Sequence, residues 1–428
     1  MNKHLITHAE VYCTETKRLQ KTNLLLTEGQ RCAERVNQDN LPDATVHAAN
    51  GCMVLPALVD LCTHLREPGY KHKGTIESET LAALSGGVTT LCCSPTTKPV
   101  NDHDAITRQI LDQSAAAGAV RVLPVGALTQ GNEGAQLSEI ASLQKAGCIA
   151  VSHSRGTPID TQTLYRCFQY AASHGLCIFF EPEDSSFAHG CLHEGPLACR
   201  LGLIGQPRLA ETSALARALL VAEETGTRLH ISQVSCARSV ELIEEAKKRG
   251  LNVSADVAIH SLVLTEQDIQ DFDTAFHTRP PLRSESDRQA LLQGVEAGVI
   301  DAIVSQHQPH DATSKAAPFA ESASGISALE TWLSLGVGLV NKGELTLAAW
   351  INATSVQPAR IAGIAPPKGL AHPADWVVFD PNETWSLTPD TLLSKGKNTP
   401  FMGQSLKGRV RSVFMDGRPA YTREAKAQ

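Results

Sequence analysis

The sequence lacks several features that mark common classes of protein. No window approaches the ~20 apolar residues of a membrane-spanning helix, and Met1–Leu26 has no long apolar stretch of the signal-peptide type. The net charge is −7, and no basic run resembles a patch that binds nucleic acid or a membrane surface. These absences predict a cytoplasmic protein with neither nucleic acid nor a membrane as its partner.

Aromatic residues and paired cysteines are also scarce. Aromatics make up 4% of the chain, so we expect a core built mainly from aliphatic residues and alanine. The twelve cysteines run from Cys13 to Cys236 without a CxxC pair, and many lie in apolar runs. We interpret them as reduced, buried thiols rather than as a disulfide framework.

Short apolar runs alternate with stretches of helical periodicity from about residue 54 to 350. Eight such runs fit the parallel strands of a (β/α)8 barrel, an α/β fold that carries its functional groups at the C-terminal ends of the strands. The predicted strands are Val54–Val59, Val88–Cys93, Val120–Val125, Cys148–Val151, Cys177–Phe180, Arg228–Ile231, Val253–Val257 and Ala302–Val304. The predicted helices are Ile76–Ser85, Asp104–Ala117, Thr161–Ser173, Glu211–Thr225 and Ser239–Arg249.

The two ends of the chain have a different pattern. Residues 1–55 and 368–428 contain alternating polar and apolar residues typical of strands, and Asp416-Gly417 predicts a hairpin turn. Neither end has enough strands to be stable alone. We therefore predict a small β-sandwich domain made of residues 1–55 and 368–428, beside a barrel domain of residues 56–367.

One segment carries a family signature. Residues 56–69, PALVDLCTHLREPG, resemble the first-strand signature of dihydroorotases, which belong to the amidohydrolase superfamily. Further similar segments follow in the family's order. They are Gly86-Gly-Val-Thr-Thr with Pro95-Thr-Thr-Lys-Pro-Val, Leu229–Ser235, Arg279–Arg283, Gly298–His310 and Ser394–Gly403. This resemblance implies a TIM-like barrel of the amidohydrolase type and a zinc-dependent cyclic-amide hydrolase.

The same resemblance implies that the metal site has been dismantled. The family's His-x-His reads Cys62-Thr-His64 here, and residues 151–156 contain neither an aspartate nor a lysine. A histidine ligand is replaced by Glu181, the next by Gln233, and the catalytic aspartate by Gln306. Glutamine accepts no proton near neutral pH and is a poor zinc ligand. We therefore expect no catalytic residue and no zinc cofactor. The degenerate metal-site positions are Cys62, His64, Glu181, Gln233 and Gln306.

The implied substrate pocket is altered as well. Thr96 and Arg279 stand where the family has asparagines, whereas Arg66 and His310 remain. Two interpretations of the arginines are open. They bind an anionic metabolite at the barrel mouth, or they pair with Glu181 or Glu67.

Several of these residues also have a purely structural interpretation. Cys62 and His64 are expected to pack inside the barrel mouth rather than to form a rebuilt mononuclear zinc site, which needs a coherent ligand set. His230 precedes Gln233 by three residues on a strand, and we expect it to be structural. We expect the same of the loop residues His307 and His310. Residues 244–249, EEAKKR, are typical of a solvated helix face.

Three functions follow from the resemblance. The first is a non-catalytic dihydroorotase-like chain that assembles with the catalytic chains of aspartate carbamoyltransferase in pyrimidine biosynthesis, and that itself forms a homo-oligomer, a dimer. The second is an active dihydroorotase or related cyclic-amide hydrolase that uses Cys62, His64 and Glu181. The third is a regulatory subunit whose vestigial pocket, with Arg66, senses a pyrimidine or carbamoyl aspartate.

Overall fold

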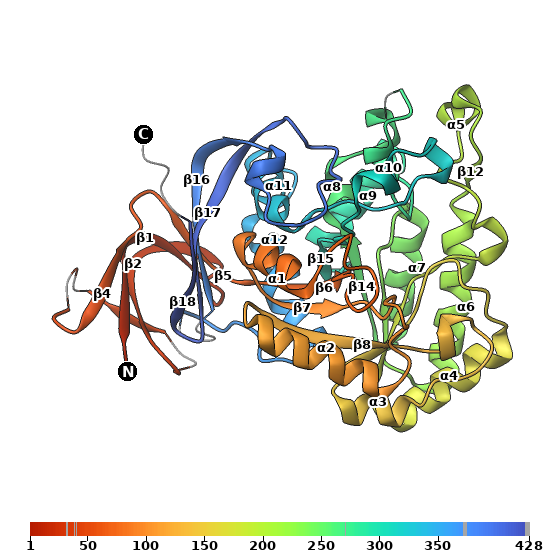
Figure 1. Cartoon of the computed structure of the whole chain (residues 1–428), viewed down its shortest axis with the longest axis horizontal. Coiled ribbons are helices and arrows are strands. Elements are labelled where there is room, and N and C mark those ends of the chain that lie inside the picture. Colours follow the sequence, from red (N-terminus) through yellow and green to blue (C-terminus); the bar gives the residue numbers. More distant parts are fainter. Residues whose placement is uncertain (31–32, 38, 40, 270, 371–374, 424–428) are drawn as a thin grey trace.

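The computed structural model describes the chain apart from residues 31–32, 38, 40, 270, 371–374 and 424–428 (Figure 1). It has two parts, a helix-covered barrel and a sheet domain that contains both ends of the chain. In the described part of the chain, no helix has the length and apolar character needed to cross a bilayer.

Eight parallel strands form the barrel and pair in sequence order. The first and last strands meet where Thr63 forms a bridge with His307 and the His64 N–H donates to the His307 carbonyl over 2.9 Å. The predicted α/β barrel is thereby confirmed. Because the strands are parallel, their C-terminal ends gather at one mouth. The strands are β6 (Leu58–Thr63), β7 (Val88–Cys93), β8 (Arg121–Ala127), β9 (Ala150–His153), β10 (Cys177–Phe180), β13 (Leu229–Ile231), β14 (Val253–Ala258) and β15 (Ala302–Val304).

Helices surround the barrel on the outside (Figure 1). Their ends follow local signals: Thr75 accepts the Ser78 N–H at the start of the first helix, and Gly118 ends the second in a left-handed conformation, φ 64°. Three of the five predicted helices, Ile76–Ser85, Asp104–Ala117 and Thr161–Ser173, have these bounds in the structure. The other two, Glu211–Thr225 and Ser239–Arg249, each begin two residues earlier, and the second ends at Lys248. The longer helices are α1 (Ile76–Ser85), α2 (Asp104–Ala117), α3 (Ile140–Ala146), α4 (Thr161–Ser173), α6 (Leu209–Thr225), α7 (Ala237–Lys248), α9 (Glu285–Glu296) and α11 (Leu329–Asn341).

Short helices and turns lie in the segments that connect the longer strands and helices. The short helices are α5 (Pro196–Leu201), α8 (Ile259–Val263), α10 (Ala312–Lys315), α12 (Leu347–Ile351), α13 (Gln357–Ile361) and the π-helical turn η6 (Asn352–Val356). The 3-10 turns are η1 (Gln130–Asn132), η2 (Ser185–Phe187), η3 (Glu266–Asp268), η4 (Thr274–Phe276), η5 (Phe319–Glu321) and η7 (Pro389–Thr391). A small parallel ribbon pairs β11 (Leu192–His193) with β12 (Gly205–Gln206).

Both ends of the chain contribute to the second sheet, as predicted. They join where β5 pairs antiparallel with β16, with Pro56 opposite Trp376. One continuous eight-stranded sheet curls around its own core, which includes Leu24, Val54 and Trp376. The hairpin at Asp416-Gly417 is present, with φ values of 51° and 76° that suit a tight turn. The strands are β1 (Lys3–Cys13), β2 (Arg18–Thr27), β3 (Glu34–Val36), β4 (Ala44–Ala48), β5 (Met53–Pro56), β16 (Trp376–Ser386), β17 (Ser405–Met415) and β18 (Arg418–Thr422).

Several predicted strands differ from the observed ones by one or two residues, since Val120–Val125, Arg228–Ile231 and Val253–Val257 correspond to β8, β13 and β14. Two differences change the path of the chain or the position of a strand end. The run Val54–Val59 is not one barrel strand, because the chain leaves the end sheet after Pro56 and enters the barrel at Leu58. Residues on both sides of this break are buried, so apolar character continues across it. The strand predicted at Cys148–Val151 begins instead at Ala150, which moves its polar end to His153.

Apolar packing holds the barrel from both sides. Small and aliphatic side chains such as Leu61, Val125 and Ala150 fill its interior, and the helix layer buries Trp332 and Trp350 completely. Replacing such a tryptophan with alanine typically costs about 3–5 kcal/mol. Of the described cysteines, all except Cys199 are buried and none forms a disulfide, in agreement with the sequence interpretation.

Candidate functional site at the barrel mouth

The predicted site residues come from the C-terminal ends of different barrel strands. Cys62 lies in β6, Glu181 follows β10, and Gln306 follows β15. His64 and Gln233 follow β6 and β13 in the same way. The parallel arrangement of the strands therefore brings these five positions to one face, as the fold predicts.

Cys62 packs inside the barrel rather than facing a polar cavity. It belongs to the apolar cluster that contains Leu61 and Phe179, and 7% of its surface is exposed. Burial raises the pKa of the Cys62 thiol well above its ordinary value, and the charges of Glu181 and Asp256 add to the rise. Since zinc binds the thiolate, this environment is unfavourable for a metal ligand.

His64 has both ring nitrogens within hydrogen-bond distance of neighbouring side chains. Nδ1 lies 3.0 Å from the Thr96 hydroxyl, and Nε2 lies 3.2 Å from the Gln308 amide nitrogen. Burial lowers the pKa of His64 well below its ordinary value, and the nearby Arg66 charge acts in the same direction. The ring is therefore neutral, and the side chains of Thr96 and Gln308 fix its orientation. Thr96, predicted in the substrate pocket, here orients the imidazole.

Gln233 and Gln306 share an unusual backbone conformation. Both have φ 49°, in the left-handed region that non-glycine residues seldom adopt. The Gln233 N–H donates to the carboxylate of Asp256 over 2.7 Å, and the Gln306 side-chain amide donates to the Arg279 carbonyl over 2.9 Å. The amide oxygen of Gln306 is buried without a hydrogen-bond partner. Neither side chain offers a carboxylate or an imidazole.

Glu181 interacts with Arg155, a residue that the sequence analysis did not single out. The Arg155 backbone N–H donates to Oε2 of Glu181 over 2.9 Å. Burial raises the pKa of Glu181, while the charge of Arg155 acts in the opposite direction. The available signal was an arginine two residues after the end of β9, in the segment where the family resemblance implies an acid or a carboxylated lysine.

The Arg155 side chain extends across the strand ends. Its Nη1 donates to the Pro182 carbonyl over 2.9 Å, and its Nη2 lies 3.4 Å and 3.3 Å from the carbonyls of Ser232 and Gln233. The guanidinium thus connects the chain after β10 with the chain after β13. It places a fixed positive charge near Glu181 and Cys62.

The two arginines of the predicted substrate pocket behave differently from each other. Arg279 forms a two-point ion pair with Glu183, with Nε 3.0 Å from Oε2 and Nη2 against Oε1. The suggested pairing with Glu181 or Glu67 was therefore wrong in its partner. Arg66 forms no ion pair with a carboxylate among the described residues, and its Nε donates to the Pro309 carbonyl over 3.0 Å.

His310 lies between two cationic side chains. Its Nε2 is 3.0 Å from Arg66 Nη2 and 2.9 Å from the Ser324 carbonyl, and its Nδ1 is 3.2 Å from Lys73 Nζ. Burial, followed by the charges of Arg66 and Lys73, lowers the pKa of His310 to about 3. The ring is neutral, and its neighbourhood is strongly positive.

Two other histidines have the structural role that the sequence indicated. His230 is fully buried, with Nε2 2.8 Å from the Asp256 carboxylate and Nδ1 2.9 Å from the Ser254 hydroxyl. His307 is also fully buried, and its Nε2 lies 2.7 Å from the carboxylate of Glu79.

The donor atoms of this site do not fit a zinc ion. Nowhere in the described residues do three or more His, Cys, Asp or Glu side chains gather as a metal site requires. The thiol of Cys62 is protonated, both ring nitrogens of His64 are engaged, and an arginine lies close to Glu181. The absence of zinc from the protein itself stays a prediction.

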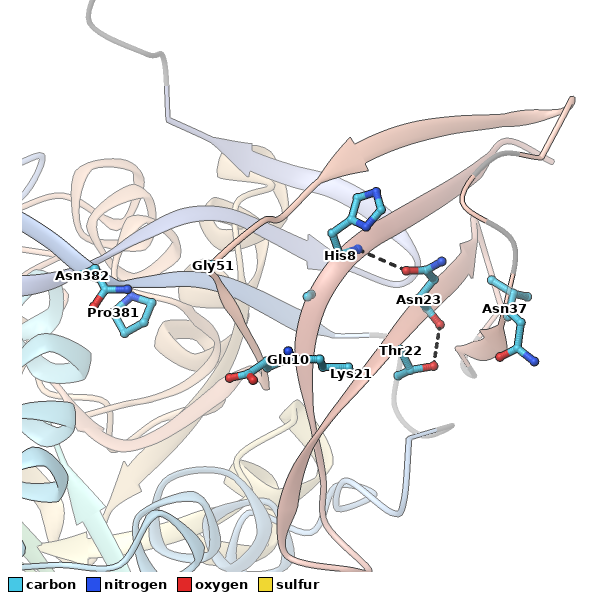
Figure 2. Close-up of a pocket in the computed structure, with 11 residues that line it drawn as sticks. His8, Glu10, Lys21, Thr22, Asn23, Asn37, Gly51, Pro381 and Asn382 are labelled. Atoms are coloured by element: carbon cyan, nitrogen blue, oxygen red, sulfur yellow. Dashed lines mark hydrogen bonds between the residues drawn. The ribbon is translucent and has the colours of Figure 1, made fainter.

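A separate hollow lies on the sheet domain, away from the predicted site. It has a volume of about 690 Å³ and is lined by residues including His8, Glu10, Lys21 and Asn382 (Figure 2). His8 has φ 58° at a bulge in β1, and its backbone N–H donates to the Asn23 side chain over 3.1 Å. None of the predicted site residues contributes to it.

Comparison with known proteins agrees with this fold and with the sequence signature. Residues 198–420 match the amidohydrolase family, and residues 51–239 match the family described as dihydro-orotase-like. The barrel is therefore that of an amidohydrolase-type protein. The chain belongs to the dihydroorotase-like family.

Curated relatives align over most of their length. A dihydroorotase-like protein of Pseudomonas aeruginosa is 45% identical, over 86% of this chain and 87% of the relative. One from Pseudomonas putida is 42% identical, over 93% and 94%. A protein of Syntrophus aciditrophicus named dihydroorotase is also 42% identical, over 93% and 94%.

Solved structures support the fold alone, because their sequences are distant. The L-hydantoinase (dihydropyrimidinase) of Arthrobacter aurescens superimposes with a TM-score of 0.85 at 24% identity, covering 98% of this chain and 96% of that one. The dihydropyrimidinase of Brevibacillus agri superimposes with a TM-score of 0.81 at 22% identity, covering 97% and 94%.

Proposed function

We propose that this chain is a catalytically inactive member of its family that serves as an assembly subunit of aspartate carbamoyltransferase in de novo pyrimidine biosynthesis. The observation that carries the first half of this proposal is the guanidinium of Arg155, which donates to carbonyls at the barrel strand ends. A guanidinium remains protonated, so it neither accepts a proton from water nor binds a metal ion. This supports the proposal that the barrel has kept its fold but has lost hydrolytic activity.

The residue that replaces the catalytic aspartate supports the same proposal. Amide hydrolysis in this fold needs a group that takes a proton from water and a Lewis acid that polarises the carbonyl. Gln306 stands at the first of these positions, and its side-chain amide donates to the Arg279 carbonyl. An amide has no proton-accepting power near neutral pH, so this position supplies no general base.

We infer aspartate carbamoyltransferase as the partner from the family resemblance, and not from a surface of the molecule. Some bacteria carry a non-catalytic dihydroorotase-like chain that assembles with the catalytic chains of aspartate carbamoyltransferase, and this chain resembles that class. The names of the two Pseudomonas relatives, dihydroorotase-like protein, agree with membership of the family. We propose the same association here, together with a dimer of this chain.

The alternative function is an active cyclic-amide hydrolase with an altered metal site at Cys62, His64 and Glu181. It is favoured by one observation, the name dihydroorotase given to several relatives that are 40–42% identical to this chain. These relatives do not decide the matter, because chemistry depends on individual site residues rather than on overall identity.

The first experiment separates these two functions. The protein is produced in a host that lacks its own dihydroorotase, and interconversion of dihydroorotate and carbamoyl aspartate is followed with and without added zinc. We expect no turnover above background, with the Syntrophus aciditrophicus relative measured in parallel as a comparison. Zinc-dependent turnover by this chain would establish the alternative.

The second experiment tests the assembly role. The aspartate carbamoyltransferase catalytic chain of the same organism is purified alone and together with this chain. Its oligomeric size is then measured by light scattering, alongside its transcarbamoylase activity. We expect the large complex and stable activity only when both chains are present. A transcarbamoylase that assembles and works normally without this chain would overturn the proposal.

A further inference from the structure

A cavity of about 580 Å³ opens beside His310, at the edge of the barrel mouth. Its walls come from residues 273–275, 310–312, 315–316, 395 and 397–399, together with His72. The volume lies in the range of sites for small molecules, about 300–1,000 Å³. Arg66, Thr96 and Arg279, three of the four predicted substrate-pocket positions, do not line it.

Three lysines line this cavity without a carboxylate partner. Their ammonium groups donate to backbone carbonyls instead: Lys315 to Thr274 over 2.9 Å, Lys395 to Lys71 over 2.6 Å, and Lys397 to Leu392 over 2.6 Å. None of the three forms an ion pair with Asp or Glu in the described part of the chain. Lys315 Nζ also lies 3.5 Å from the His277 carbonyl. Because an ammonium has three hydrogens to donate, each lysine retains at least one for a further acceptor.

More positive charge lies directly behind the wall of the cavity. Arg66 and Lys73 approach the two ring nitrogens of His310 at 3.0 Å and 3.2 Å. Burial lowers the pKa of Arg66 to about 10, so this guanidinium stays charged at neutral pH. The charges of Arg66, Lys73 and Lys315 all disfavour a proton on His310, which shows that they act on the same small region.

The two carboxylates in the cavity wall, those of Asp273 and Asp311, accept hydrogen bonds from neighbouring residues of the chain. The carboxylate of Asp273 accepts the Ala275 N–H over 2.9 Å. Asp311 accepts both the N–H and the hydroxyl of Ser314, at 3.0 Å and 2.7 Å, and lies 3.8 Å from His72 Nε2. Each thus caps a short helical turn. The five cations are Arg66, Lys73, Lys315, Lys395 and Lys397, and they outnumber the carboxylates that act on them, Glu79, Asp273, Asp311 and Glu330.

We propose that this cavity binds a small organic anion with at least two negative charges, such as a phosphorylated or dicarboxylic metabolite, through Lys315, Lys395 and Lys397. The methyl groups of Ala275, Ala312 and Ala316 in the wall provide apolar contact for the carbon skeleton of such a ligand. Charge-assisted hydrogen bonds from several lysines are the interactions that select a dianion over a neutral molecule. This binding requires neither hydrolytic chemistry nor a transcarbamoylase partner.

Calorimetric titration of the full chain tests the proposal, with inorganic pyrophosphate and succinate as probes at constant ionic strength. We expect saturable binding of one probe molecule per chain. The variants Lys315→Gln and Lys397→Gln should each weaken binding by about tenfold. The matched control is Lys342→Gln, which removes an exposed charge after α11 and should leave affinity unchanged.

The two probes also distinguish the ligand class. Tighter binding of pyrophosphate supports a phosphorylated ligand, and tighter binding of succinate supports a dicarboxylic one. Absence of saturable binding by both probes would overturn the proposal, as would an equal loss of affinity in Lys342→Gln. If Lys315→Gln fails to fold, the Lys395→Gln/Lys397→Gln double variant decides, since Lys395 is exposed and Lys397 half-buried.

Discussion

The backbone N–H of Arg155 donates to the carboxylate of Glu181 over 2.9 Å, and the two residues follow neighbouring barrel strands. The side chain of the same arginine then reaches carbonyls beyond β10 and β13. A single residue therefore ties three strand ends together at the mouth. The positive charge of Arg155 also counteracts the rise that burial produces in the pKa of Glu181.

Replacing Arg155 with alanine should lower the free energy of unfolding. The change removes charge-assisted bonds to three carbonyls at a partly exposed site, so we expect a loss of about 1–3 kcal/mol. Urea denaturation followed by circular dichroism measures it. The control is Arg238→Ala on the exposed face of α7, where the ion pair with Glu241 is solvated and we expect no measurable change. Equal stability of the two variants would contradict this role for Arg155.

Metal analysis of freshly purified protein should find less than one zinc ion per chain. Among the residues that the structure describes, no three donor side chains converge to hold the ion, and both ring nitrogens of His64 are engaged by Thr96 and Gln308. Treatment with a chelator should leave the melting temperature unchanged, because no folding free energy comes from metal binding. Stoichiometric zinc, with a drop in melting temperature after its removal, would count against this prediction.

The buried pair of His307 and Glu79 should be essential for stability. Replacing His307 with leucine leaves the Glu79 carboxylate without this partner, and breaking such a buried pair typically costs about 3–5 kcal/mol. Glu79→Gln is the control, because it keeps an oxygen for the His307 N–H and removes the buried charge. We expect it to cost less in urea denaturation. If the His307→Leu variant were as stable as the Glu79→Gln variant, the His307–Glu79 pair would not be essential for stability.

The acid side of the stability profile should depend on His260. Both of its ring nitrogens are buried without a hydrogen-bond partner, and burial lowers its pKa from 6.5 to about 4. Between these values the unfolded chain binds a proton that the folded chain does not. Stability therefore falls as the pH falls, by about 1.4 kcal/mol per pH unit.

His260→Leu should reduce that slope by one proton between pH 6.5 and pH 4. Urea denaturation at a series of pH values gives the slope directly. His189→Leu makes the same chemical change at an exposed position and serves as the control. Identical slopes in His260→Leu and the unmodified protein would rule out His260 as a source of the acid sensitivity.

Local patterns in the sequence were sufficient for much of the fold. Helix α4 begins where Asp160 accepts the Thr163 N–H, a signal contained within four residues, and its bounds were predicted. The break between β5 and β6 was missed, because apolar residues continue through Pro56 and Ala57 and both strands are buried. The ribbon of β11 and β12 was also missed, since two-residue strands have no periodicity to detect.

The site was predictable in its residues but not in its contacts. From the order of the motifs we could predict that Cys62, Glu181 and Gln306 lie on one face of the barrel. They did not reveal that Arg279 pairs with Glu183 rather than with Glu181, two residues earlier. That choice depends on side-chain directions set by distant strands. The role of Arg155 depends on carbonyls of residues 182, 232 and 233, which no local spacing connects to it.

The pairing of β5 with β16 has a consequence for how the protein is made. Pro56 meets Trp376 across the sheet, so the entire barrel lies between them in the chain. During synthesis β5 is made before the barrel and β16 after it, so the edge of β5 that β16 covers stays unpaired until the barrel has been synthesised. The edge of β5 is therefore paired only after β16 has been synthesised. A truncated chain that ends before Trp376 leaves this edge open to other chains and is prone to aggregate.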